Sequence, residues 1–311
     1  QGALAIAPTR ESPLARLLRP VPEPRLSPKK PPAGAVLGAP TLKVVESPIS
    51  NDWDWIKPLL DATIERDQPL WVEPKKHMRG SGVGAECVRA MTLDMLGHRV
   101  PFAAHTLRIF RVGNLIEQAN VEVMGKAGIL ADTQSLAEYT DPPIIGHFDM
   151  SVFRRPGDGK IILGEMKSIK SALFNKLPPE HGPTLAGESP LMKTHASYVK
   201  QWTAYAGREL GGPPFDEGFI LFEEKDAHRQ KVYYLLFDID LYDEMLAHVK
   251  EATDYVALDP PRAAPIPADR DPFSDKDRTC ASCPKRYLCR MIPVEGATLD
   301  EVKLIDGKLR G

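Results

Sequence analysis

Two apolar segments, residues 144–153 and 160–167, limit the folds that are open to this chain. The residues between them include Pro156-Gly157-Asp158-Gly159, a strong turn signal, so the two segments are predicted to pair as an antiparallel hairpin. Residues 218–224 and 231–238 show the same pattern and predict a second hairpin. Because helical segments precede, separate and follow the hairpins, the expected fold class is α/β, with a mixed central sheet flanked by helices.

Apolar residues with helical spacing predict the helices. The first begins near Asn51, and its apolar stripe consists of Trp55, Leu59, Leu60 and Ile64. The others cover residues 85–96, 106–124, 189–210 and 241–256. In the helix over 189–210, Ser189 is expected as the N-cap and Pro190 at the first helical position. In the helix over 106–124, the residues expected to be buried are Leu107, Ile109, Phe110, Leu115 and Ile116.

The N-terminal 45 residues differ in composition from the rest of the chain. Nine of the 30 prolines lie in the first 40 residues, together with scattered Arg and Lys, which predicts a flexible basic tail over residues 1–45. Residues 46–290 are expected to form the main domain and residues 291–311 a C-terminal extension. Without a run of 18 apolar residues, the chain is not expected to span a membrane. Its net charge of −2 excludes a protein that coats nucleic acid indiscriminately, but not one with a local basic groove.

The first hairpin carries an unusual set of charged side chains. Asp149 interrupts an apolar strand, while Glu165 and Lys167 leave the same face of the next strand. A three-residue loop would place Asp149 opposite Glu165, and a five-residue loop opposite Lys167. A four-residue loop would place it opposite Met166 and separate the three groups. Two carboxylates and a lysine on one face favour a divalent cation, Mg²⁺ or Mn²⁺. A salt-bridged strand pair without a metal is the alternative.

Residues on two predicted helices extend this set. Glu117 lies one turn after Gly113, where the absence of a side chain permits a close backbone approach. Gln201 and Tyr205 are four residues apart and therefore share one face of the helix over 189–210.

The ordered motifs Gly113-xxx-Glu117, Gly146-xx-Asp149, Glu165-x-Lys167 and Gln201-xxx-Tyr205 resemble those of the RecB-type branch of the PD-(D/E)XK nucleases. The resemblance covers roughly residues 75–290. It implies that residues 46–290 form a nuclease domain with a restriction-endonuclease-like PD-(D/E)XK core. It also implies DNA hydrolysis with Mg²⁺ or Mn²⁺.

The same resemblance implies the roles of individual residues. The implied metal ligands are Glu117, Asp149, Glu165 and the carbonyl of Met166. Lys167 is implied as the catalytic lysine, and Gln201 and Tyr205 as the pair that positions DNA. Many relatives carry histidine where this chain has Glu117, a departure that keeps an oxygen ligand but bears on metal preference and on the strength of the activity. Strand alternation puts His147 on the face of Asp149, where it is a candidate for a minor role.

The four cysteines form a second constellation. Cys280-x2-Cys283-x5-Cys289 lies near the C-terminus, and Cys87 lies far upstream. This spacing fits no ordinary disulfide pattern, and the thiolates suit Zn²⁺ or an iron–sulfur cluster. The resemblance extends to iron–sulfur RecB-type nucleases, which include AddB-like subunits and CRISPR-associated adaptation exonucleases. It therefore implies a [4Fe-4S] cluster, with Zn²⁺ as the alternative, in the reducing cytoplasm of a bacterial or phage-infected cell.

Joining Cys87 to the C-terminal cysteines would make the cluster a structural staple. The link closes a loop of about 200 residues. Treated as a cross-link, it would reduce the conformational entropy of the unfolded chain and raise its free energy by on the order of 5 kcal/mol. Loss of the cluster is then expected to impair folding and DNA binding first, and cleavage indirectly.

Basic residues flank both constellations and are candidates for phosphate contacts. They are Lys75, Lys76, His77, Arg79, Arg99, Arg108, Arg111, Lys170, Lys176, Lys193 and Lys200. About half are expected to be ordinary solvated surface. Trp202 and Tyr198 would stack on unpaired bases, or Trp202 would belong to the core. Residues 173–190 are expected to form a mobile loop near the site.

These patterns predict a metal-dependent DNA nuclease, an exonuclease acting on single strands or DNA ends without sequence preference. A second hypothesis is a catalytically weak DNA-binding subunit of a recombination, repair or CRISPR-adaptation-like complex. An RNA-acting enzyme is a third, because nothing in these motifs distinguishes recognition of the 2′-hydroxyl. The expected protein partners are recombination or repair proteins, or further copies of this chain.

Overall fold

The computed structural model describes residues 56–66, 68–155, 157, 159–207 and 215–310, which belong to a unit that begins at Trp53. The predicted tail over residues 1–45, and Trp55 of the first predicted stripe, lie outside the described residues.

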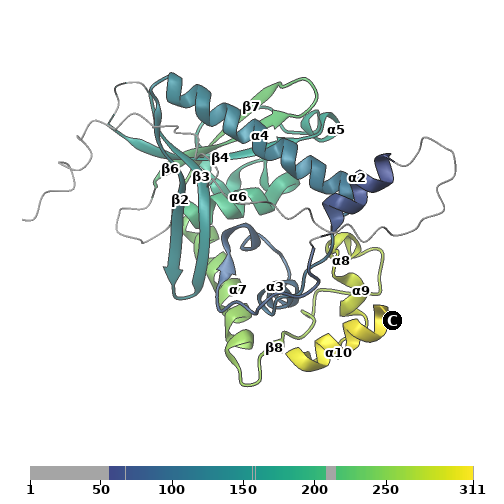
Figure 1. The fold of residues 1–311 in the computed structure, drawn as a ribbon. Helices are drawn as coiled ribbons and strands as arrows, with labels where there is room; N and C mark the ends of the chain where they lie inside the picture. Colours follow the sequence, from purple (N-terminus) through teal and green to yellow (C-terminus); the bar gives the residue numbers. More distant parts are fainter. Residues whose placement is uncertain (1–55, 67, 156, 158, 208–214, 311) are drawn as a thin grey trace, which may run out of the picture. The chain divides into compact units, whose positions relative to one another are not determined.

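A mixed sheet of seven strands forms the centre of the described residues (Figure 1). Its strands are β1 (Met78–Arg79), β2 (Leu130–Thr140), β3 (Pro143–Phe153), β4 (Ile161–Ile169), β5 (Thr184–Leu185), β6 (Glu217–Glu224) and β7 (Gln230–Leu236). The order is β1-β3-β4-β6-β7-β5, with β2 paired to β3. The pairs β3–β4 and β6–β7 are antiparallel, whereas β4 and β6 are parallel. Both predicted hairpins are confirmed, and so is the α/β class with a mixed sheet.

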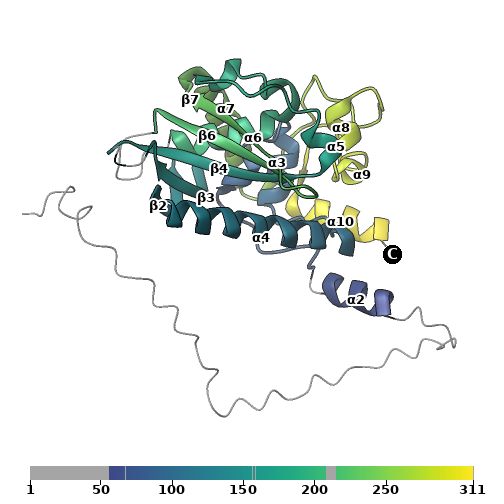
Figure 2. The same cartoon turned by 90° about the horizontal axis from the view of Figure 1, so that it is seen from above.

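Helices cover both faces of this sheet (Figure 2). On one face lies α4 (Ala104–Lys126), whose Ile116 is buried with Met150 and Phe219 of the sheet. On the opposite face lie α6 (Met192–Ala206) and α7 (Ile239–Ala257). Trp202 of α6 is 0% exposed and packs in a cluster that includes Phe148. The sheet therefore separates two buried layers.

A third buried cluster lies beside the sheet. It joins α3 (Val88–Met95), α7, α9 (Arg286–Cys289) and α10 (Leu299–Arg310). Nearby are a two-stranded sheet of β8 (Arg262–Ala263) and β9 (Ala297–Thr298), and the short α8 (Arg278–Ser282). The buried Asp306 holds α10 in place: the Trp71 indole N–H donates to its Oδ2 (3.0 Å) and the Tyr287 hydroxyl to its Oδ1 (3.1 Å). The predicted C-terminal extension thus packs into the same core as α3.

The β3–β4 register is the one that brings the hairpin carboxylates together. Met150 pairs with Gly164 and Phe153 with Ile161, and this register continued by one residue would set Asp149 opposite Glu165. Of the three registers considered, it is the one expected of a three-residue loop, although the strands end at Phe153 and begin again at Ile161. The four-residue loop, which would have separated the charged groups, is excluded.

Strand β3 is irregular at Asp149. Phe148 belongs to the buried layer of α6, whereas Met150 belongs to the layer of α4. Residues two apart in a regular strand share a face, so the strand turns over at this point. Across the ladder, Gln134 of β2 lies opposite Asp149 and has a φ of 52°. The alternation that placed His147 on the face of Asp149 therefore does not hold; His147 is exposed and Asp149 half-buried.

The predicted buried face of α4 is largely wrong. Ile116 is buried, but Ile109, Phe110 and Leu115 are exposed and Leu107 is half-buried. The helix meets the sheet through Gly113, Ile116 and residues after them, whereas Phe110 packs against Phe102 (5.0 Å between ring centroids). Its N-terminal half contacts α2 (Ile56–Glu65), where Leu59, Leu60 and Ile64 are also exposed.

Three further expectations differ in detail. Helix α6 begins at Met192 with Leu191 at the N-cap position, so Ser189 and Pro190 precede the helix. Ser189 follows a 3-10 turn, and its hydroxyl accepts from the Leu191 N–H (3.3 Å). Residues 173–190 contain the end of α5 (Ser171–Phe174), β5 and that turn, with Phe174 and Leu177 buried, so this segment is packed. Strand β2 was not predicted because most of its side chains are exposed or half-buried.

In the described ranges, no helix combines the length and the apolar character that crossing a membrane requires.

Candidate functional site

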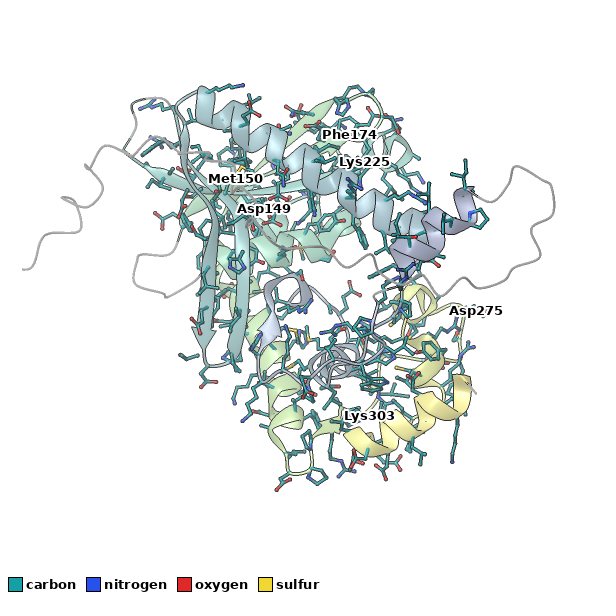
Figure 3. The ribbon with its side chains drawn as sticks, in the orientation of Figure 1. Asp149, Met150, Phe174, Lys225, Asp275 and Lys303 are labelled. Carbon is teal, nitrogen blue, oxygen red and sulfur yellow. The ribbon has the colours of Figure 1, made fainter. Side chains whose placement is uncertain are left out.

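The paired strands β3 and β4 bring Asp149, Glu165 and Lys167 together. Figure 3 shows Asp149 on the sheet beneath α4. Its Oδ2 accepts a hydrogen bond from the Met166 N–H (2.8 Å), which ties it to β4. Lys167 Nζ donates to Glu165 Oε1, and these two side chains are 18% and 0% exposed. The second oxygen, Glu165 Oε2, is buried and has no hydrogen-bond partner among the described residues.

Glu117 joins this group from α4. The approach of the helix to β4 is close, because a Cβ at Gly113 would lie 2.9 Å from Ser168 Oγ. Gln134 Nε2 donates to Glu117 Oε1 (2.7 Å), so a residue of β2 orients the helix carboxylate. Sequence reasoning missed Gln134, since neither the strand nor its positive φ has a signal in the sequence.

The pKa values show how strongly these groups interact. Complete burial raises the pKa of Glu165 to about 7, although Lys167 acts to lower it. Burial also raises the pKa of Asp149, and burial together with the charge of Asp149 raises the pKa of Glu117. Burial acts to lower the pKa of Lys167, but the facing carboxylates outweigh this effect and raise it. The site thus concentrates negative charge that its single lysine does not fully compensate.

Gln201 and Tyr205 lie on the inner side of α6, as their shared face predicts. They are 9% and 3% exposed, and burial is the main cause that raises the pKa of Tyr205. The Tyr205 ring fills the space beside two glycines, because a Cβ added at Gly80 or at Gly146 would collide with the Tyr205 hydroxyl. Tyr205 therefore connects the loop after β1 with the strand that carries Asp149.

The aromatic residues of α6 divide into two kinds. Trp202 is fully buried and its indole N–H donates to the Leu163 carbonyl (3.3 Å), so it belongs to the core and cannot stack on a base. Tyr198 is half-buried, stacks on His195 (5.7 Å between ring centroids) and faces Lys167 Nζ at 5.3 Å. Of the two predicted stacking residues, Tyr198 is the one that borders the charged group.

The four cysteines come from three separate segments. Cys87 precedes α3, Cys280 and Cys283 lie on and after α8, and Cys289 ends α9. Burial is the main cause that raises the pKa of Cys280 to about 12 and that of Cys289 to about 11, and in both cases neighbouring thiols contribute. Burial, with a contribution from Cys283, raises the pKa of Cys87. The fold thus gathers the thiols that the sequence grouped.

A buried arginine lies beside these thiols. Arg89 is 1% exposed, and its guanidinium donates to the carbonyls of Ala264 (2.7 Å), Pro293 (2.5 Å) and Val294 (2.9 Å). Its Nη1 has no hydrogen-bond partner among the described residues. Burial lowers the pKa of Arg89, while nearby Cys289 acts to raise it. A buried cation beside Cys87 and Cys289 fits an anionic thiolate-bound group.

Within the described part of the chain, no set of three or more His, Cys, Asp and Glu side chains is arranged to hold a metal ion as it stands. The fit of each cofactor therefore rests on donor chemistry. The unpartnered Glu165 Oε2, with Asp149 and Glu117, suits a hard cation. The four thiols and the Arg89 guanidinium suit an iron–sulfur cluster or Zn²⁺.

The predicted phosphate-contact residues separate into groups. Lys75, His77, Arg79 and Arg99 line one pocket, together with Lys285, which the sequence did not single out. Other predicted contacts have acidic partners: Arg108 pairs with Asp61, and Lys200 pairs with Glu244 (3.3 Å). Lys193 lines a separate recess beside His195.

Comparisons with known proteins leave the family open. No protein-family model and no curated protein matches this sequence. Among solved structures, one described as "Crystal structure of SSO0001" is similar, with 15% sequence identity over 74% of this chain and 97% of that chain. Its TM-score is 0.41, a likeness that assigns neither a family nor an activity.

Proposed function

We propose that this chain is a divalent-metal-dependent deoxyribonuclease with a PD-(D/E)XK core of the RecB type. Its substrate would be single-stranded DNA or DNA ends, cut as an exonuclease without sequence preference. The observation that carries the proposal is the fully buried Glu165, whose Oε2 lacks a partner while Asp149 and Glu117 lie close enough to shift its pKa. Burying a carboxylate in this way is costly without a compensating cation.

Each side chain has a role in this proposal. Asp149, Glu165 and Glu117 would bind Mg²⁺ or Mn²⁺, with the Met166 carbonyl as a further ligand. When bound, the cation would lower the pKa of a water nucleophile and stabilise charge on the phosphate. Lys167, kept protonated by the facing carboxylates, would orient that water or stabilise the developing negative charge.

Residues of α6 would position the DNA. Gln201 and Tyr205 are mostly buried, so they would act on the DNA mainly by supporting the site from inside the protein. Tyr205 does so by packing against the loop after β1. Tyr198 borders Lys167 and would offer a face for an unpaired base.

The cysteines support a second part of the proposal. Cys87, Cys280, Cys283 and Cys289 would bind a [4Fe-4S] cluster as a staple, with Zn²⁺ as the alternative. A reducing cytoplasm would keep these thiols available.

A cleavage assay with 5′- and 3′-labelled single- and double-stranded DNA tests the proposal. We expect label loss that requires Mg²⁺ or Mn²⁺, that stops in EDTA, and that is abolished by Asp149→Asn or Lys167→Ala. Glu122→Gln on the exposed face of α4 is the matched acidic control and should cut normally. Wild-type rates in Asp149→Asn would overturn the mechanism.

A second candidate is a catalytically weak DNA-binding subunit of a recombination, repair or CRISPR-adaptation-like complex. It is favoured by Glu117, which stands where many relatives of the resembled family carry histidine and whose pKa is raised by burial and by Asp149. A carboxylate that retains its proton binds a cation poorly. In that case DNA binding would persist in the assay while label loss stays at background with either metal.

A further inference from the structure

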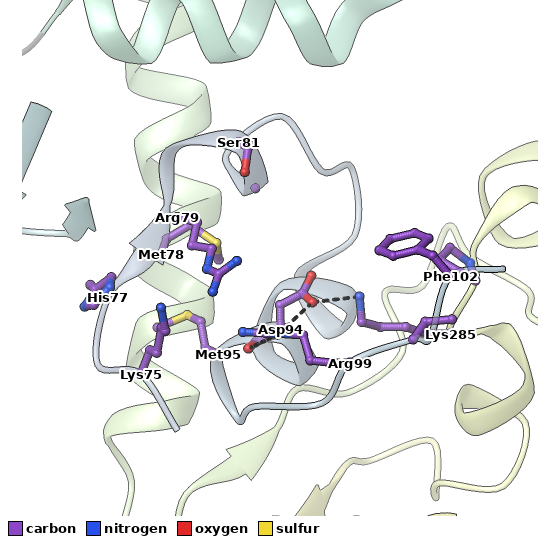
Figure 4. Close-up of a pocket in the computed structure, with 13 residues that line it drawn as sticks. Lys75, His77, Met78, Arg79, Ser81, Asp94, Met95, Arg99, Phe102 and Lys285 are labelled. Carbon is purple, nitrogen blue, oxygen red and sulfur yellow. Dashed lines mark hydrogen bonds and ion pairs between the residues drawn. The ribbon is translucent and has the colours of Figure 1, made fainter. Parts of the chain in front are cut away.

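A basic pocket lies between the loop that contains β1 and the segment after α3 (Figure 4). It has a volume of about 280 Å³. Lys75, His77 and Arg79 form one wall, and Asp94, Arg99 and Lys285 face them, with Asp94 joined to Arg99 and Lys285. The side chains come from three separate segments of the chain, which converge on one recess.

The pocket has an excess of positive charge. Four cationic side chains line it against one carboxylate, Asp94, in the part of the chain that the structure describes. Asp94 is already shared, at 3.4 Å from Arg99 Nη1 and 2.9 Å from Lys285 Nζ. Lys75 and Arg79 have no carboxylate on their wall; Glu138, which interacts with His77, lies outside the lining. Burial and the charges of Arg79 and Arg99 lower the pKa of Lys75. A bound anion would offset this repulsion between the cations.

Part of the pocket is rigidly built. The Lys285 side chain is 10% exposed and is held by Asp94. Arg99 also donates to the carbonyls of Asp94 (3.0 Å) and His98 (2.9 Å). Because these cations are fixed before any ligand arrives, little ordering entropy opposes anion binding.

The pocket adjoins the candidate catalytic group. Arg79 pairs with Ile145, four residues before Asp149 on β3, which corresponds to roughly 13 Å along the strand. Gly80 follows Arg79 directly and touches Tyr205, whose pKa responds to Glu165, Lys167 and Asp149. A strand of nucleic acid can span such a distance with about four stacked nucleotides.

We propose that this pocket binds a phosphoryl group of the nucleic-acid strand on which the candidate site acts. The inference rests on the proposed function, which identifies the strand as DNA. It adds to the candidate catalytic group a second place at which the protein holds that strand. The phosphoryl group is a terminal monoester or an internal diester. An excess of three positive charges favours the dianionic terminal group, and arginine and lysine are the usual donors to phosphate.

The sequence offers a matched pair of variants to test this. Lys75 lines the pocket and its neighbour Lys76 does not, so Lys75→Gln and Lys76→Gln remove the same charge from adjacent positions. Arg79→Gln is an independent pocket variant with an exposed side chain. Circular dichroism of each variant checks that it folds.

Binding is measured by fluorescence anisotropy with one single-stranded oligonucleotide in three forms: 5′-phosphorylated, 3′-phosphorylated and without a terminal phosphate. EDTA is present, and the salt concentration is varied. We expect the wild type to prefer one phosphorylated form, and Lys75→Gln and Arg79→Gln to lose that preference. Each should also reduce the slope of log affinity against log salt concentration (the salt slope) by about 0.7, the value for one phosphate contact on a single strand. Lys76→Gln should retain the preference.

The arms distinguish the two sources of the phosphoryl group. If the three oligonucleotides bind equally, but Lys75→Gln and Arg79→Gln lower the affinity and the salt slope while Lys76→Gln does not, the pocket binds an internal phosphate. The proposal is overturned if Lys75→Gln and Lys76→Gln weaken binding equally, or if neither pocket variant has an effect. Because EDTA prevents metal-dependent cleavage, this assay measures phosphate binding by the pocket independently of nuclease activity. A protein without nuclease activity can still bind through the pocket, and an active nuclease can lack such binding.

Discussion

Glu165 gives the sharpest prediction, because its pKa of about 7 lies within the range in which enzymes are assayed. A cation binds the ionised carboxylate, so protons compete with the metal at this residue. For a pKa of about 7, roughly 90% of the side chain is ionised at pH 8 and roughly 10% at pH 6. The apparent affinity for Mn²⁺ should therefore fall about tenfold from pH 8 to pH 6, or about 1.4 kcal/mol. The raised pKa values of Asp149 and Glu117 act in the same direction.

The measurement is isothermal titration of the wild type with Mn²⁺ at pH 6, 7 and 8. At pH 7 the heat should vary with the ionisation enthalpy of the buffer, because binding releases about half a proton. Glu165→Gln should bind Mn²⁺ weakly and show a smaller pH dependence, the part that comes from Asp149 and Glu117, whereas Glu122→Gln should resemble the wild type. An affinity that stays constant from pH 6 to pH 8, or a dependence that is undiminished in Glu165→Gln, would refute the reasoning.

The same group affects the stability of the metal-free protein with a defined sign. The folded pKa of Glu165 is raised from 4.5 to about 7, so the folded state binds this proton more tightly than the unfolded state. The resulting stability is fully present below pH 4.5 and is lost as the pH rises through 7, a change of about 3 kcal/mol. Urea unfolding of wild type and Glu165→Gln across this range should show the difference, and saturating Mn²⁺ should reduce it.

Three further predictions follow from other contacts. Lys167→Met should lower the cleavage rate at least 100-fold, a typical cost of losing one charge-stabilising group, in a single-turnover assay. It should also lower the melting temperature, because the buried Glu165 loses the cation that faces it. Gln134→Gly keeps the positive φ but removes the donor to Glu117, so Mn²⁺ affinity should fall several-fold, whereas Gln134→Ala should in addition lower stability by about 1 kcal/mol in urea unfolding. Cys280→Ser should reduce the iron content of anaerobically purified protein and weaken DNA binding before it affects chemistry; one zinc with no iron or sulfide in the wild type would contradict the cluster.

The sequence predicted the parts of the fold whose signal is local. The turn between residues 153 and 161, and the apolar strands on either side of it, determine the register that, continued by one residue, would set Asp149 opposite Glu165. Helix α7 was predicted within two residues at its start and one at its end, because its buried residues, from Leu241 to Val256, recur with helical spacing.

Other features depend on contacts that local patterns do not encode. The exposed Ile109, Phe110 and Leu115 of α4 have helical spacing, but the helix meets the sheet through Gly113 and Ile116 instead. Gln134 approaches Glu117 because β2 pairs with β3, and a mostly exposed edge strand carries little apolar signal. Lys285 enters the basic pocket because the cysteine segment folds back onto α3, a contact between residues 191 positions apart.

The attachment of α10 has a consequence for how the protein is made. Asp306 accepts the indole N–H of Trp71, a residue synthesised 235 positions earlier. Until residues 299–310 leave the ribosome, α3 lacks part of its apolar covering, including the fully buried Val302. The nascent chain must therefore keep this surface from aggregating from the synthesis of α3 until that of α10, and a premature stop shortly before Asp306 would leave it exposed permanently.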